Sequence, residues 1–201
     1  MKKMLAIAAL LSATSFAHAN LVVNGSFEDY STVTPGTWRI FGSGNGWTTS
    51  QYGVEVRNAV AGTADDGARF VELDTTANSW ISQVVHTSAN QLLELAFAYA
   101  SRAGVAANSN GIEIFWNNLS LGSLTGNGTN GNGWLDHVYH VQADANGLGA
   151  LTFAAIGTSD SYGGSLDNVS VTAIPEPDTI AMLLTSLGLL AAVTRRRKSR
   201  I

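Results

Sequence analysis

The fold class that this sequence predicts for residues 20–173 is all-β, an antiparallel β-sandwich of the jelly-roll kind. Short runs in which apolar and polar residues alternate are separated by turns rich in glycine and asparagine. Between Asn20 and Asp178, no segment keeps a helical spacing of apolar residues for long. Since 45% of the chain is hydrophobic, the sandwich has enough apolar side chains for one core.

The chain begins with the regions of a secretory signal peptide over residues 1–19. Lys2 and Lys3 give a basic start, Met4–Leu11 is an apolar run, and Ala17 and Ala19 are the small residues of a cleavage site. We expect this segment to be a helix that signal peptidase removes by cutting after Ala19.

About ten strands are predicted between the signal peptide and residue 173. The alternation is clearest at Leu93–Tyr99, where large apolar residues alternate with glutamate and alanine. The expected strands are Leu21–Val23, Val54–Arg57, Arg69–Leu73, Trp80–His86, Leu93–Tyr99, Ile112–Trp116, Leu119–Leu124, Asp136–Ala143, Leu151–Ala154 and Leu166–Thr172. Many short strands with frequent turns are typical of sandwiches and jelly rolls.

A long loop is expected over Ser123–Trp134, which alternates glycine with polar residues. Glycine and asparagine tolerate positive φ angles, so this segment can turn tightly. We favour a plain connection between strands, and a loop that grips a ligand is the alternative.

Residues 174–201 have the composition of a sorting tail. Pro175, Glu176 and Pro177 precede an apolar run over residues 179–194, and a basic end follows over residues 195–200. Basic residues stay cytoplasmic when an apolar helix enters a membrane, so this order predicts a stop-transfer segment. The run is shorter than the ~20 residues that cross a bilayer comfortably, which suits a short transmembrane helix that anchors only temporarily.

This three-part order resembles the PEP-CTERM sorting signal of Gram-negative bacteria. The resemblance implies that an exosortase-type membrane protease recognises the tail and cleaves it near Pro175-Glu176-Pro177. It also implies a transient anchor in the inner membrane, followed by a place at the cell surface or outside the cell, often beside exopolysaccharide. The tail is a targeting signal and carries no active site.

The charge of the exported segment is strongly acidic. All 15 acidic residues lie between residues 20 and 178, against four arginines and no lysine, which leaves a net charge of −11. A surface with no basic patch argues against nucleic acid as a partner and is compatible with Ca²⁺, which prefers oxygen ligands. The chain has no cysteine, which excludes thiol chemistry and cysteine-bound zinc.

A second resemblance covers most of residues 20–173. Asn24-Gly25-Ser26-Phe27-Glu28 opens the segment, Val71-Glu72-Leu73-Asp74 follows, and Ser165–Val171 closes it. In this order the motifs are similar to the galactose-binding-like jelly rolls of secreted proteins and carbohydrate-binding modules. The resemblance implies a sandwich, frequently a structural Ca²⁺, and in some members the binding of sugar or matrix.

A calcium site is expected where the two ends of this domain meet. With a period of two, Asp167 points to the same core side as Val169 and Val171, and a buried carboxylate needs a partner. In the related modules, the Glu of the opening motif and the Asp of the closing motif bind one Ca²⁺, which carries over onto Glu28 and Asp167. The alternative is that Asp167 caps backbone amides while Glu28 is solvated.

Four residues are the predicted sugar-binding site. Pyranose rings stack their apolar faces on exposed aromatic rings while polar groups fix the hydroxyls. Trp38, Trp134 and Tyr162 lie beside glycine-rich turns, and Arg102 can donate hydrogen bonds. The other candidates are Trp47, Tyr52, Trp80 and Arg69. Trp116, in phase with its apolar neighbours along a strand, is expected in the core.

Signals for catalysis are weak in this sequence. His137 and His140 are three residues apart, which places them on opposite faces of a strand. Glu72 and Asp74 share a strand face about 7 Å apart, as some glycosidase pairs do, but we expect both to be solvated. We therefore expect a non-catalytic surface or matrix protein whose jelly roll binds glycan or exopolysaccharide. The alternatives are a structural matrix component without a specific ligand and a polysaccharide hydrolase.

Overall fold

The structure is a computed structural model of the chain, and it describes residues 19–128, 133–175, 185 and 188. Most of the predicted signal peptide lies outside the described residues, as do Glu176, Pro177 and the basic end of the tail. Within the described ranges, no helix is long and apolar enough to cross a membrane. The predicted division into signal peptide, sandwich and tail stays a prediction.

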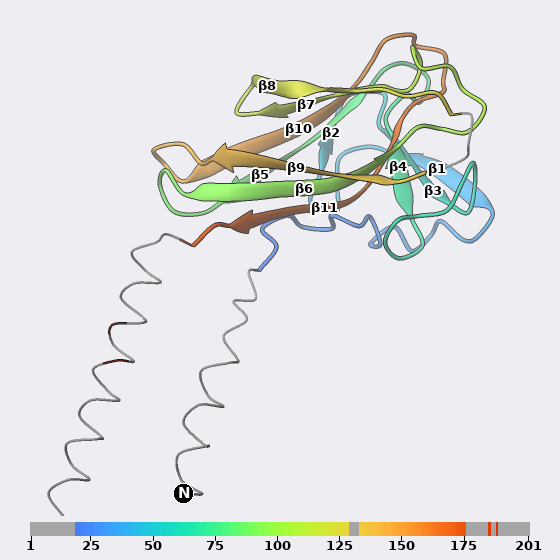
Figure 1. Ribbon diagram of the computed structural model, residues 1–201. Helices are drawn as coiled ribbons and strands as arrows, with labels where there is room; N and C mark the ends of the chain where they lie inside the picture. The colour runs from blue at the N-terminus through green and yellow to red at the C-terminus, as the bar shows by residue number, and fades with distance from the viewer. Residues whose placement is uncertain (1–18, 129–132, 176–184, 186–187, 189–201) are drawn as a thin grey trace, which may run out of the picture.

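Two antiparallel sheets pack as a sandwich (Figure 1). The order in the six-stranded sheet is β1-β3-β4-β11-β6-β9, and the order in the five-stranded sheet is β2-β5-β10-β7-β8. The strands are β1 (Thr37–Phe41), β2 (Thr48–Thr49), β3 (Val54–Asn58), β4 (Phe70–Glu72), β5 (Trp80–His86), β6 (Leu92–Ala100), β7 (Gly111–Trp116), β8 (Leu119–Leu124), β9 (Leu135–Gln142), β10 (Leu148–Ile156) and β11 (Ser165–Ala173). The predicted all-β, antiparallel fold class is confirmed.

The core lies between the sheets and follows the alternation in the sequence. Leu93, Leu95 and Phe97 of β6 point inward and are buried. Leu151 and Phe153 of β10 enter the same core cluster from the other sheet, and the rings of Phe97 and Phe153 meet edge to face at 4.9 Å between centroids. Burying each such side chain contributes about 1.5–3 kcal/mol, so the hydrophobic cluster is the main source of stability.

The predicted strand Leu21–Val23 is wrong, because side chains take the hydrogen bonds of this segment. Asn20 Oδ1 accepts the N–H of Val22 at 3.0 Å. The Gln83 side-chain amide bonds both backbone groups of Val23, with N···O distances of 2.7 and 3.0 Å. With the N–H of Val22 and both backbone groups of Val23 bonded to side chains, the segment forms no regular ladder of backbone hydrogen bonds.

Strands β1 and β2 lie outside the predicted set, while the other nine predicted strands are present. β1 pairs with β3 at the edge of its sheet, and its residues are exposed apart from half-buried Phe41, so no alternation marks it. β2 is only two residues long and pairs with β5.

Both ends of the described domain meet β11 (Figure 1). The Leu21 N–H donates to the Val171 carbonyl at 2.8 Å, while Ile174 directly follows the last strand and its N–H donates to the Leu92 carbonyl at 2.9 Å. The chain therefore passes from the last strand into Pro175 with no linker.

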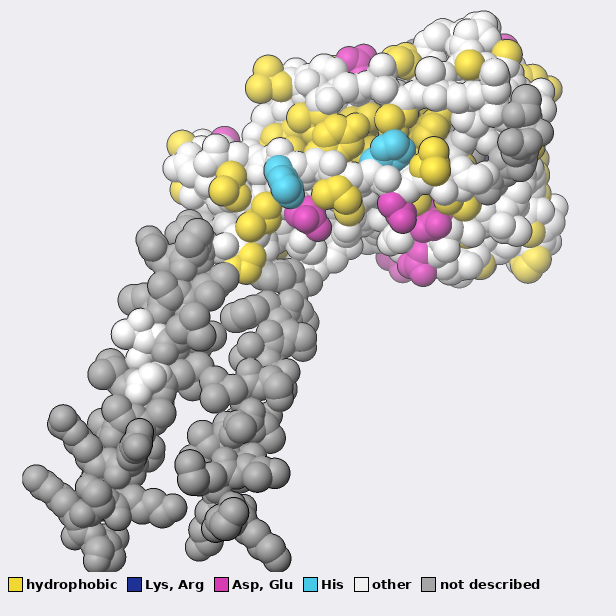
Figure 2. Space-filling view, in the orientation of Figure 1, with side chains coloured by type: hydrophobic (Ala, Val, Ile, Leu, Met, Phe, Trp, Pro, Cys, Tyr) yellow, Lys and Arg dark blue, Asp and Glu magenta, His cyan; other side chains and the backbone are white. Residues whose placement is uncertain are grey.

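Acidic side chains mark the face drawn in Figure 2, together with histidines and a band of hydrophobic side chains. Among the described residues, no Lys or Arg is visible on this face. The surface thus agrees with the acidic composition of the exported segment.

Candidate functional site

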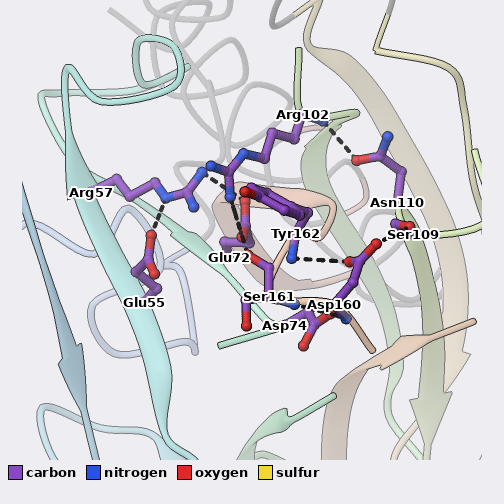
Figure 3. Close-up of polar contacts among 10 residues, drawn as sticks. All are labelled: Glu55, Arg57, Glu72, Asp74, Arg102, Ser109, Asn110, Asp160, Ser161 and Tyr162. Carbon is purple, nitrogen blue, oxygen red and sulfur yellow. Dashed lines mark hydrogen bonds and ion pairs between the residues drawn. The ribbon is translucent and has the colours of Figure 1, made fainter. Parts of the chain in front are cut away.

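A cluster of polar side chains lies at the end of the sandwich where β11 begins (Figure 3). Four segments meet there: β3, β4 with the residues just after it, the loop between β6 and β7, and the loop between β10 and β11. Loops at the end of a rigid sandwich often carry binding residues. This end of the domain is the candidate functional site.

Buried ion pairs underlie the cluster. The Arg57 guanidinium lies 2.5 Å from Glu55 and 2.6 Å from Glu72, and the Glu72 side chain is 0% exposed. Arg102 contacts the second oxygen of Glu72 at 3.0 Å. Burial raises the pKa of Glu72 to about 7, and the two arginines oppose that rise. Since an unpaired buried charge is costly, Glu72 holds the Arg102 guanidinium in place.

Arg102 and Tyr162 form the outer edge of the cluster. The guanidinium carbon of Arg102 lies over the Tyr162 ring, 4.4 Å from its centroid, in a cation–π contact. The Tyr162 side chain remains 46% exposed. An exposed ring held by a buried network is a preorganised surface, which lowers the entropic cost of binding.

Asn110 and Asp74 fix the two loops. Asn110 is fully buried. Its side-chain Oδ1 accepts the backbone N–H of Arg102 at 2.8 Å, and its side-chain Nδ2 donates to three loop carbonyls. Asp74 Oδ2 accepts the N–H groups of Asp160 and Ser161 at 2.9 and 3.1 Å. Burial raises the pKa of Asp74, while these amides lower it. The loops are therefore held by side chains from neighbouring segments.

An open pocket of about 480 Å³ lies against these loops. Arg102 and Tyr162 line it together with Ser109, Asp160 and the small residues 103–106. Ser109 Oγ donates to Asp160 Oδ2 at 2.8 Å. A guanidinium, a carboxylate, a hydroxyl and a ring can together stack on an apolar surface and bond hydroxyl groups.

The structure brings Arg102 and Tyr162 together but places Trp38 and Trp134 elsewhere. Trp38 lies on edge strand β1 and is 50% exposed. Trp134 is half-buried, and its indole N–H donates to the Thr63 carbonyl at 2.9 Å. Neither tryptophan lines the pocket.

The core prediction for Trp116 is confirmed, since the side chain is 5% exposed and its indole N–H donates to the Gln142 carbonyl at 2.7 Å. Ser109 and Asp160 are pocket residues that the sequence did not single out. Both lie in irregular loops, where no periodicity marks a side chain, and the nearest signal is the position of Asp160 two residues before Tyr162.

The prediction that Glu72 and Asp74 are solvated is wrong, because both side chains are fully buried. Strand β4 lies between β3 and β11, so neighbouring chain segments cover it on either side. Arginines neutralise Glu72 and loop amides bond Asp74, which removes the need for water.

Glu28 and Asp167, the predicted calcium ligands, both bond the loop of residues 65–69. Glu28 Oε1 accepts two N–H groups from this loop at 2.7 Å each, and its other oxygen lies 2.7 Å from the Arg69 guanidinium. Asp167 Oδ2 accepts two further N–H groups of the loop, at 2.8 and 3.0 Å. Asp167 thus caps backbone amides, one of the two roles expected for it.

The fit of these carboxylates to Ca²⁺ depends on Asp167. Its side chain is 0% exposed, and burial raises its pKa to about 7. Oδ1 accepts one N–H, from Asn168 at 2.7 Å, and therefore keeps a lone pair that suits a hard cation. Among the described residues, no group of three or more His, Asp or Glu could hold a metal. The calcium site stays a prediction, with backbone carbonyls needed to complete it.

Residues 173–198 match the PEP-CTERM protein-sorting motif. This motif marks an exported protein that passes through a membrane-anchored intermediate and is processed by an exosortase. The predicted resemblance of the tail is therefore confirmed, whereas the removal of residues 1–19 by signal peptidase stays a prediction.

The domain itself is similar to a segment of a large toxin. It is 33% identical over 158 residues to the multifunctional-autoprocessing repeats-in-toxin of Vibrio cholerae serotype O1. The match covers 76% of this chain and 3% of the toxin, so the chain spans a small part of that protein.

Solved structures that are similar to this chain include an adhesin domain and a carbohydrate-binding module. The K1 adhesin domain of Lys-gingipain from Porphyromonas gingivalis W83 has a TM-score of 0.51 at 15% identity, covering 69% of this chain and 98% of that one. A family 16 carbohydrate-binding module has a TM-score of 0.49 at 15% identity, covering 76% and 99%. The chain thus combines an antiparallel β-sandwich with a PEP-CTERM sorting motif.

Proposed function

We propose that this chain is an exported, non-catalytic protein that binds glycan through the pocket at Arg102 and Tyr162. The observation that carries the proposal is the Tyr162 ring, which is 46% exposed yet held in place by the Arg102 guanidinium 4.4 Å away. An exposed aromatic ring whose position is fixed by its neighbours suits stacking against the apolar face of a sugar.

The polar groups beside the ring suit the hydroxyls of a sugar. Asp160 accepts hydrogen bonds from Ser109 and from the Tyr162 N–H, which orients its carboxylate at the pocket wall. A carboxylate has lone pairs beyond these two bonds, so it can accept further bonds from hydroxyl groups. The Arg102 guanidinium supplies N–H donors, which complement the acceptor oxygens of the Asp160 carboxylate.

The charge of the pocket favours an uncharged sugar. Arg102 already pairs with Glu72, and Asp160 adds a negative charge to the pocket lining. The exported segment carries four arginines against 15 acidic residues, so its field repels anions. A neutral hexose meets neither repulsion nor an unpaired charge.

The sorting motif supports a role for this binding outside the inner membrane. After exosortase processing, the jelly roll would stand at the cell surface or in the surrounding matrix, where exopolysaccharide is a neutral or acidic glycan at high local concentration. Exopolysaccharide with neutral sugars is the proposed partner.

A glycan array tests the proposal against a purely structural role. The full chain, purified in mild detergent, is expected to bind neutral glycans and to bind polygalacturonic acid weakly or not at all. An array without any bound glycan would contradict the proposal and support a structural matrix component.

The remaining alternative is a polysaccharide hydrolase. Both oxygens of Glu72 are paired with arginines and Asp74 bonds loop amides, so neither is placed to transfer a proton to a substrate. Incubation of the chain with each bound polysaccharide should release no reducing sugar. Turnover would overturn the non-catalytic assignment.

A further inference from the structure

Strand β9 forms one edge of the six-stranded sheet and crosses the front of the molecule (Figure 1). It pairs with β6 over its whole length without a shift in register. Its sequence contains no lysine and no proline, which natural sheets use to block the pairing of edge strands. A long, regular edge of this kind is suited to pairing with another strand.

The other edges of the two sheets are less suited to pairing. β2 is only two residues long, and a shift in register interrupts β8 where it pairs with β7. β1 carries exposed Arg39 at its centre, so antiparallel pairing of two copies about this residue would place like charges opposite each other. Among the described strands, β9 is therefore the edge best suited to pairing.

The backbone of β9 directs alternate residues away from β6. The Gln142 carbonyl accepts the Trp116 indole N–H from the other sheet at 2.7 Å, so it points away from β6. The N–H of the next residue, Ala143, donates to the Gln91 carbonyl on the β6 side at 3.0 Å. Backbone groups alternate in this way along an antiparallel ladder.

Asp136, Val138 and His140 lie an even number of residues from Gln142 and direct their backbone N–H and C=O groups to the open side. In the described part of the chain, no loop or side chain bonds these groups. Their side chains are exposed as well, 56% for Val138 and 70% for His140. The edge thus presents backbone groups together with one acidic, one apolar and one imidazole side chain.

These three side chains are complementary to a second copy of the same strand. When two β9 strands run antiparallel with their Val138 residues opposite each other, Asp136 of each copy lies opposite His140 of the other. Opposite charges at directly paired positions stabilise a sheet. The same register aligns the outward backbone groups, which gives about six hydrogen bonds between the strands.

We propose that two copies of this chain associate through β9 and continue the six-stranded sheet across a two-fold axis at Val138. The exported segments, each with four arginines against 15 acidic residues, repel each other, but this repulsion is screened beyond ~8 Å at physiological ionic strength. Glu94, the one charged residue of β6, lies 3.7 Å from His140 in its own copy. In the pair, a carboxylate therefore lies on either side of each imidazole.

This interface goes beyond the proposed function, because no residue of β9 other than Leu135 lies near a pocket and none lines the Arg102–Tyr162 pocket. Glycan binding and self-association can therefore be tested independently. A contact between two edge strands is small, and we expect a dimer Kd on the order of 10–100 µM.

Sedimentation velocity of the full chain in density-matched detergent tests the association at about pH 6, where histidine is partly charged. Val138→Pro removes an N–H that faces the open side, where an edge strand tolerates proline, and should raise the dimer Kd by about tenfold or more. Val138→Thr, which keeps the N–H and the β-branched shape, is the matched control and should keep the dimer.

An exchange of charges tests the register. His140→Asp places two carboxylates opposite each other and should raise the dimer Kd by about tenfold or more. Adding Asp136→His to this variant restores opposite charges in the same register and should return the Kd to within about threefold of the wild type.

Since the chain has no cysteine, a single introduced thiol reports the position of the axis. Val138→Cys places the two Cα atoms about 5.5 Å apart, a distance that a disulfide spans. Leu135→Cys, at another exposed position of β9, places them about 20 Å apart. Mild oxidation should link the first variant and not the second.

Three results would each overturn the proposal. One is a chain that stays monomeric at every concentration up to about 1 mM. Another is a dimer whose Kd neither Val138→Pro nor His140→Asp changes, which would place the contact elsewhere. The third is equal crosslinking of the two thiol variants, which would exclude the two-fold axis at Val138.

Discussion

Two buried carboxylates, those of Glu72 and Asp167, each hold a neighbouring segment of the domain in place. Glu72 anchors the arginine that supports Tyr162, and Asp167 ties the loop of residues 65–69 to β11. Both side chains are fully buried, and burial raises the pKa of each to about 7. These groups therefore couple the stability of the fold to pH.

The raised pKa of Asp167 predicts that the free energy of unfolding falls as the pH rises. Between its ordinary pKa of 3.8 and its folded pKa of about 7, the folded carboxyl keeps a proton that the unfolded one has lost. The free energy of unfolding should therefore decrease from about pH 4 to about pH 7, by up to ~1.4 kcal/mol per pH unit. Chemical denaturation of the full chain in buffers with a chelator measures this slope.

Asp167→Asn removes this titrating carboxyl, so the free energy of unfolding should fall less steeply with pH. The remaining slope is the contribution of Glu72. Asp136→Asn, at an exposed position on β9, is the matched control and should leave the slope as in the wild type. Equal slopes in all three proteins would exclude Asp167 as the source.

Calcium at Glu28 and Asp167 predicts a rise in melting temperature with Ca²⁺ concentration, because a ligand that binds only the folded state stabilises it by mass action. Differential scanning calorimetry measures the rise, and Asp167→Asn should abolish it. Mg²⁺ at equal ionic strength controls for screening of the acidic surface, since it demands a smaller octahedral site. If both ions shift the melting temperature equally, there is no specific calcium site.

At the scale of elements, alternation in the sequence was enough to predict the strands that face the core. The prediction failed for Leu21–Val23. These apolar residues have the composition of a strand, but a side-chain amide forms the hydrogen bonds of the Val23 backbone. It also missed β1, an edge strand without a buried face. Both failures concern partners distant in sequence, which a local pattern does not contain.

The Gln83 side chain is expected to attach the segment around Val23 to strand β5. Gln83→Ala removes both hydrogen bonds to Val23 and leaves two backbone groups without those partners. We expect the free energy of unfolding to drop by about 1–3 kcal/mol in urea denaturation. Gln51→Ala, at an exposed glutamine, should cost less than about 0.5 kcal/mol. Equal losses would show that the opening segment does not depend on Gln83.

For the whole molecule, the sorting motif and the proposed binding pocket lie at different places in one chain. The sorting motif begins where β11 ends, and the pocket lies at the opposite end of that strand. The sequence indicated Arg102 and Tyr162, but their contact depends on a buried Glu72 from a third segment. Such convergence of one strand and two loops is a property of the tertiary structure and has no local pattern.

Changing Pro175, Glu176 and Pro177 to alanine should leave the chain in the inner membrane, because the processing enzyme no longer recognises it. Cell fractionation with an antibody against the jelly roll measures its location. The melting temperature of the jelly roll should stay within about 1 °C of the wild type, since the change lies outside its strands and outside its hydrophobic core. Normal appearance of the variant at the cell surface would contradict the role of the motif.

The most direct test of the central claim is a titration of the full chain with the best neutral sugar from the glycan array. Tyr162→Ala should raise the Kd by about tenfold or more, because it removes the stacking surface. Tyr52→Ala, at another exposed tyrosine outside the pocket, should leave the Kd unchanged. Unchanged affinity in Tyr162→Ala, or equal losses in both variants, would contradict sugar binding at this pocket.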